Sequence, residues 1–191
     1  MEITRPHPTE LAPETPSDLR PLLHFLNSRP IGYESEGLPD ARSAGAYLRA
    51  SGFDLADADL GADDLALLHR LRDSLTTVLD RDRDAAELEA AWHAIREIAA
   101  ESPVTIVLGP DPHAALEPAS RGARGVVERV LADMHAAIAN GRFDRLRLCA
   151  YEPCGGAFYD ATRSRTQRWH SYATCGNRVN VAAHRKRVST G

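Results

Sequence analysis

Cysteine is scarce in this sequence, and its scarcity limits the classes of protein to which the chain can belong. Only three cysteines occur among 191 residues, which excludes the dense disulfide framework of a small secreted domain. No apolar run approaches the roughly 20 residues of a membrane-spanning helix. Internal repeats, glycine-rich phosphate-binding loops and hydrolase-type nucleophile elbows are also missing. The sequence therefore favours a globular protein with no legible enzyme motif.

Length and composition suit one medium domain, or one domain with a small module attached. A hydrophobic content of 43% is enough to build a buried core. Residues 1–18 are acidic and rich in proline, which is not typical of a signal or transit peptide. We therefore expect a cytoplasmic protein.

Charge divides the chain into two unlike parts. Residues 1–140 contain 13 arginines and 24 acidic residues, whereas residues 141–191 contain ten arginines and lysines against three acidic residues. The C-terminal part thus carries a net charge of +7 and the remainder −11. An acidic body argues against a nucleic-acid surface spread over the whole protein, and the basic segment is the place where a polyanion would bind. The alternative is a charged terminus that is simply solvated.

The acidic part has the periodicity of a mostly helical domain. Helices are predicted over 19–28, 41–50, from Asp63 or Asp64 to about 78, over 85–100 and over 121–139, where leucine, valine and alanine recur at helical spacing. The run 104–108 is β-branched and predicts a strand. Asn140 and Gly141 predict a helix C-cap and a domain boundary. We expect a mainly α domain with a minor sheet over 1–140, and a separate module over 141–191.

All three cysteines lie within 27 residues of that C-terminal module. Cys149 and Cys154 have the same spacing as His170 and Cys175. Two such pairs can supply the four nitrogen and sulfur ligands of a tetrahedral zinc ion. Pro153, Gly155 and Gly156 predict a tight turn around Cys154, at the end of a hairpin, and Cys175 precedes a helical stretch. This order of turn ligands and helix-start ligands is the layout of a treble-clef zinc finger.

Three other interpretations of the cysteines exist. A disulfide between Cys149 and Cys154 is disfavoured in a reducing compartment and leaves one cysteine over. Three buried structural thiols do not explain the matched spacing. A site of three cysteines without His170 would leave an open coordination position for catalysis. With four protein ligands the zinc is structural and has no reactive water.

Cys175-Gly-Asn-Arg178 resembles the signature of the CGNR zinc-finger family. The resemblance extends to the earlier cysteine pair and to Phe158, Asp160 and Thr162, which match a Phe-x-Asp-x-Ser/Thr run. The family has an Arg-Trp-Cys step before the last ligand, and this chain has Arg168-Trp169-His170, so a histidine replaces one cysteine. In the family the finger follows a domain named ABATE. The resemblance implies a bacterial, stress-linked transcription regulator.

Residues 24–29 resemble the Asn-Thr step near the start of ABATE domains, with Ser28 in place of threonine. In such a domain His24, Asn27, Arg29 and Tyr33 would line a pocket for a small effector. The alternative, which we favour, is an ordinary capped helix end.

The basic segment predicts a DNA-binding face on the helix that follows Cys175. Arg178 and Arg185 are two turns apart and share a face. Arginine and asparagine on this helix are candidates to read bases, and the arginines of the preceding loop are candidates to contact phosphates. Asn177 and Arg178 have a rival structural role next to the ligand. The candidate residues are Arg163, Arg165, Arg168, Asn177, Arg178, Asn180, His184, Arg185, Lys186 and Arg187.

The sequence thus predicts a zinc-containing transcription regulator with double-stranded DNA as its partner, possible homodimers and no membrane contact. A finger that binds RNA or a protein is the main alternative, because finger folds serve many roles. An enzyme is a third interpretation, with its site near His24, Asn27, Arg29 and Tyr33. No acid–base or nucleophile–base set is legible there.

Overall fold

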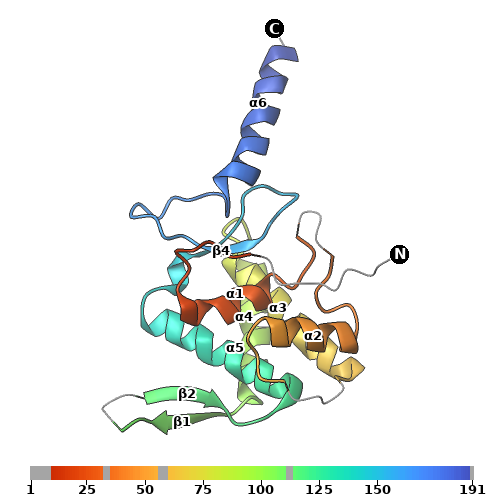
Figure 1. Ribbon diagram of the computed structural model, residues 1–191, viewed down its shortest axis with the longest axis vertical. Coiled ribbons are helices and arrows are strands. Elements are labelled where there is room, and N and C mark those ends of the chain that lie inside the picture. The colour runs from red at the N-terminus through yellow and green to blue at the C-terminus, as the bar shows by residue number, and fades with distance from the viewer. Residues whose placement is uncertain (1–9, 32–34, 56–59, 111–113, 190–191) are drawn as a thin grey trace.

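The computed structural model describes residues 10–31, 35–55, 60–110 and 114–189, with the backbone alone for 183, 184 and 186–189. Tyr33 lies outside the described residues. Within these described residues, five helices form the body, a small hairpin lies at one end, and the last helix projects from the other end (Figure 1).

The body helices are α1 (Arg20–Leu26), α2 (Ala41–Ala50), α3 (Ala62–Leu79), α4 (Ala85–Ala100) and α5 (Gly122–Ala139). A short 3₁₀ turn, η1 (Ser17–Leu19), precedes α1, and neither carries a side-chain cap. Asp40 caps α2 by accepting from the Ser43 backbone N–H at 2.9 Å. Asp84 and Glu87 form a capping box on α4.

The core lies where α1, α3 and α5 meet. Leu23, Phe25, Leu68, Leu71 and Val127 are fully buried there. The apolar residues at helical spacing on α2 and α3 point inward. On α4 the buried residues are Ala91, Ile95 and Ile98, and this helix packs against α3.

Each of the two small sheets in the described chain is an antiparallel hairpin. The first pairs β1 (Val104–Leu108) with β2 (Ala114–Pro118), and the second pairs β3 (Leu146–Leu148) with β4 (Ala157–Tyr159). The strand β1 was predicted and β2 was not, since Ala-Ala-Leu-Glu-Pro has low strand propensity and is a strand only through its pairing. A 3₁₀ turn, η2 (Phe143–Arg145), joins α5 to β3.

The C-terminal segment ends in a short π-helical turn, η3 (Tyr172–Gly176), followed by α6 (Asn177–Ser189). Among the described elements α6 packs chiefly against η3 and stands clear of the body (Figure 1). No helix in the described ranges is long and apolar enough to cross a membrane.

Residues 10–16 of the proline-rich N-terminal stretch pack on the body. Leu11 packs against the core and Thr15 is buried. Residues 1–9 of that stretch lie outside the described chain.

Candidate metal centre

The β3–β4 hairpin positions the first pair of candidate ligands. Cys149 follows β3, and its backbone N–H donates to the Gly156 carbonyl at 2.8 Å, which extends the pairing by one step. Cys154 lies in the turn, where its N–H and that of Gly155 both donate to the Tyr151 carbonyl. Gly155 has φ of +58°, a left-handed conformation that glycine adopts without strain. The predicted tight turn at the hairpin end is confirmed.

One backbone hydrogen bond and one helical turn bring His170 and Cys175, the second pair of candidate ligands, close to the first pair. Ala150 N–H donates to the Arg168 carbonyl at 2.8 Å, which brings the chain before His170 alongside the hairpin. Cys175 lies in η3, where its N–H donates to the Ser171 carbonyl at 3.0 Å. It therefore lies directly before the N-terminus of α6.

Folding brings together the four side chains that the sequence singled out. The ligand atoms of Cys149, Cys154, His170 and Cys175 all lie within 4.8 Å of one another. The Nδ1 atom of His170 is 3.3 Å from Sγ of Cys154 and 3.6 Å from Sγ of Cys175. A tetrahedral zinc ion with bonds of about 2.0–2.3 Å spaces its ligand atoms by roughly 3.5–3.8 Å. The cluster fits one structural zinc ion.

The chemistry of the donor set agrees with this fit. All three thiols are buried, where uncompensated polar groups are costly. A hydrogen bond from the Cys154 thiol lowers the pKa of Cys149 to about 4. The same hydrogen bond raises the pKa of Cys154, and burial raises the pKa of Cys175. Zinc binds cysteine as the thiolate, so zinc binding at this cluster would release thiol protons.

Asp160 anchors the loop that leads from the hairpin to His170. Its fully buried carboxylate accepts the backbone N–H groups of Thr162 and Gln167, each at 3.0 Å, and the Thr162 hydroxyl at 2.5 Å. Arg147 of β3 lies 3.3 Å from the same carboxylate. Burial alone would raise the pKa of Asp160, but these hydrogen bonds and the arginine outweigh it and hold the pKa below its usual value. The sequence identifies Asp160 only as a motif position, and its role as an anchor follows from the structure.

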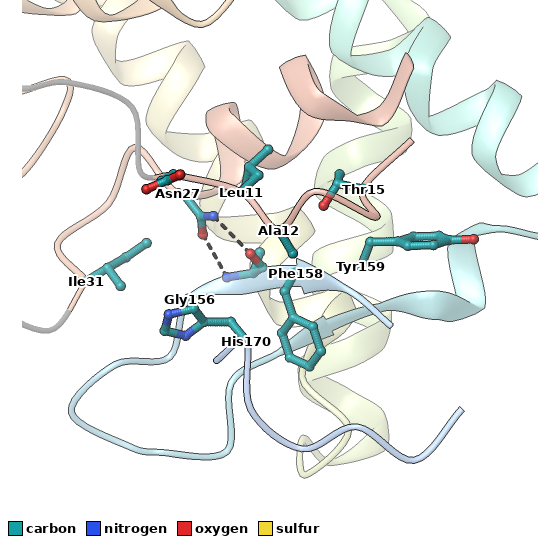
Figure 2. A pocket seen from close by; sticks show the side chains of 11 residues that line it. Leu11, Ala12, Thr15, Asn27, Ile31, Gly156, Phe158, Tyr159 and His170 are labelled. Carbon is teal, nitrogen blue, oxygen red and sulfur yellow. Dashed lines mark hydrogen bonds between the residues drawn. The ribbon is translucent and has the colours of Figure 1, made fainter. Parts of the chain in front are cut away.

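The residues predicted to line an effector pocket are divided. Asn27 lines a small cavity of about 30 Å³ between the N-terminal stretch and β4, together with Thr15, Ile31, Phe158 and His170 (Figure 2). Arg29 lies outside that lining and donates to the Gly155 carbonyl. His24 lies on α1, also outside it, where burial lowers its pKa. Asn27 and Arg29 thus contact the hairpin of the metal centre, and no sequence pattern predicts these contacts.

The predicted nucleic-acid residues lie on two exposed parts of the C-terminal segment. Arg163, Arg165 and Arg168 are exposed on the loop before His170, and Arg168 stacks 5.5 Å from the ring centre of Trp169. Arg178 and Arg185 are exposed on α6. The side chains of His184, Lys186 and Arg187 lie outside the described residues.

The two asparagines of α6 have partners inside the C-terminal segment. The Asn177 amide donates to the Ala173 carbonyl at 3.0 Å, and the Asn180 amide donates to the Tyr172 hydroxyl at 3.1 Å. These contacts join the start of α6 to η3, so they favour the structural role weighed for Asn177.

Fold and cluster define a class of protein, a mostly helical domain followed by a short zinc-binding segment. Comparison with known families then supplies its family. Residues 19–146 match the ABATE family, described as "Putative stress-induced transcription regulator", and residues 145–188 match the CGNR zinc finger. Because the first match covers more than half of the chain, the protein belongs to the ABATE family, with a CGNR zinc finger at its C-terminal end. No curated protein matches the chain.

Proposed function

We propose that this protein is a DNA-binding transcription regulator in which the zinc finger presents α6 to the duplex. The observation that carries the proposal is the position of α6, a basic helix that begins at a zinc-ligand turn and projects from an acidic body (Figure 1). Both matched families are of regulator or zinc-finger type, which supports a regulator rather than an enzyme.

The shape of the C-terminal segment suits a duplex. A helix of 13 residues that stands clear of its own protein can enter a major groove. Arg178 and Arg185 are exposed on it, and arginine binds guanine through two hydrogen bonds. Arg163, Arg165 and Arg168 lie on the adjacent loop and are suited to phosphates. Asn177 and Asn180 have hydrogen bonds to η3, so we assign base reading first to Arg185, which lies further along the helix.

Binding should depend strongly on salt. Each phosphate contact steepens the fall of log affinity with log salt by about 0.9. We expect Arg185→Ala to weaken duplex binding, whereas Arg42→Ala, which removes the same charge from an exposed site on α2, should leave it unchanged. Fluorescence anisotropy with a labelled duplex from low to high salt measures both effects. No binding by the zinc-loaded protein, or equal behaviour of the two variants, would contradict the proposal.

A single finger offers a small contact area, so specific binding calls for two copies on one operator. We therefore include homodimer formation in the proposal. Separately, we propose that the N-terminal domain binds a small effector. Analytical ultracentrifugation with and without duplex tests the first.

A protein-binding finger is the second candidate, and one observation favours it. Val181 on α6 and Tyr172 on η3 are large apolar residues that are exposed next to the arginines. A competition assay separates the candidates. If single-stranded RNA or a protein of equal charge displaces the bound duplex, that competitor is the better candidate for the partner.

A further inference from the structure

One side chain of the N-terminal domain pairs with the zinc hairpin as a strand would. The Asn27 amide nitrogen donates to the Ala157 carbonyl at 2.9 Å, and the Ala157 N–H donates to the Asn27 amide oxygen at 2.7 Å (Figure 2). The two residues are 130 positions apart, and Asn27 is buried. Asn27 lies just after α1, so the helical body satisfies both backbone groups of the first residue of β4.

Two further residues of the same stretch touch the turn that carries Cys154. The Arg29 guanidinium donates to the Gly155 carbonyl. Ile31 is buried and packs in one cluster with Cys149, Cys154 and Cys175. The apolar wall of the metal centre therefore comes partly from the N-terminal domain.

The two glycines of the turn fit against this stretch. A Cβ atom on Gly155 would lie 3.1 Å from Nη2 of Arg29, and one on Gly156 would lie 3.3 Å from Cγ2 of Ile31. The Gly156 N–H also donates to Sγ of Cys154 at 3.4 Å. A movement of residues 27–31 would thus displace Gly156, which contacts Sγ of Cys154 directly.

Charge strengthens the link. A zinc ion with three thiolates and a neutral imidazole carries a net charge of −1. Arg29 is the cation on the N-terminal stretch whose charge acts on Cys154. A half-buried guanidinium beside such a centre stabilises the metal-bound form more than the free thiols.

We infer that residues 27–31 of the N-terminal domain form the outer support of the zinc centre, so that zinc retention by the finger depends on the body. Groups that orient metal ligands typically change metal affinity by about 10–100-fold. By linkage the effect is reciprocal, and zinc binding stabilises the 27–31 stretch to the same degree. The inference rests on the zinc centre alone and not on DNA binding.

The test is the rate at which the full-length, zinc-loaded protein releases zinc to a coloured chelator. We expect Asn27→Ala to release zinc about 10–100-fold faster, with the helical circular dichroism retained. Asn27→Asp keeps the shape, loses the donor and adds a negative charge, so it should be at least as fast. The matched control is Asn140→Ala, at the exposed C-cap of α5.

A second variant covers the case in which Asn27→Ala does not fold. Arg29→Met keeps the side-chain length without the charge, and it should also release zinc faster than wild type, with Arg42→Met as its control. Hydrogen exchange gives the reciprocal readout, since zinc removal should speed exchange at residues 27–31. Zinc release at the wild-type rate from folded Asn27 and Arg29 variants would overturn the inference. No DNA is present, so this outcome is independent of the proposed function.

Discussion

The two hairpins of this protein have similar strand pairing and very different surroundings. Every residue of β1 is exposed, and Ile106 and Leu108 are 66% and 76% exposed. In the β3–β4 hairpin Leu146, Ala157 and Phe158 are buried. Asn27, Asp160 and the four-ligand cluster also stabilise this hairpin. A two-stranded hairpin alone is at best marginally stable in water. We infer that contacts from outside the hairpin stabilise β3–β4.

Zinc removal should have the largest effect on the difference in stability between the two hairpins. A structural zinc ion contributes on the order of 10–16 kcal/mol of apparent binding free energy in a small finger. We expect chelation to unfold the β3–β4 hairpin and the loop to Cys175, and to leave β1–β2 and the body helices folded. Hydrogen exchange resolved by segment measures this. Equal loss of protection in both hairpins would contradict it.

His170→Ala should give the next largest effect. The variant removes one ligand and leaves three buried thiols, so zinc binding weakens and the finger loosens while the helical body stays folded. His170→Cys is the matched control, because it restores a four-cysteine set and should keep zinc. Zinc content after dialysis reports both, and a fully loaded His170→Ala protein would remove His170 from the site.

Asp160→Asn tests the contribution of the loop anchor to stability without changing any of the four metal ligands. The substitution keeps the shape and removes the charge that faces Arg147, which should cost on the order of 3 kcal/mol in the finger. Because the pKa of Asp160 is depressed in the folded protein, its contribution is complete above its unfolded pKa and is lost as pH falls through the folded one. The wild-type finger should therefore lose stability in acid more than the variant does. Asp144→Asn, at an exposed neighbouring site, is the control.

Much of the fold and of the metal centre could be predicted from signals within short stretches of the sequence. The bounds of α2 and α4 follow from helical periodicity and caps, and the ligands follow from cysteine and histidine spacing, because both signals lie within short stretches. The strand β2, the Asn27–Ala157 pairing and the place of Ile31 could not be predicted. Each depends on partners that only folding brings together, 130 residues apart for Asn27, and Asn27 itself reads as an ordinary helix end.

Gly156→Ala should have a smaller effect, confined to the hairpin. Its Cβ would lie 3.3 Å from Ile31 and 3.5 Å from Sγ of Cys154, so the neighbours must shift. Overpacking of this kind costs about 1–3 kcal/mol. Gly45→Ala, inside α2 with its nearest neighbour at 3.6 Å, should be neutral or stabilising. Thermal unfolding of both variants with zinc present measures the difference.

Ile106→Thr on β1 should have the smallest effect. The side chain is mostly exposed, and surface substitutions usually change stability by no more than about 0.5 kcal/mol. Phe158→Ala on β4 removes a buried ring and should cost about 3–5 kcal/mol. Similar losses of stability in urea for the two variants would remove the distinction between the hairpins.

The most direct test of the zinc centre is X-ray absorption at the zinc edge, combined with the metal content of the purified protein. The account predicts one zinc ion per chain, with three sulfur neighbours at about 2.3 Å and one nitrogen at about 2.0 Å. A metal-free protein with an ordered β3–β4 hairpin, or a zinc ion without the three-sulfur, one-nitrogen shell, would contradict it.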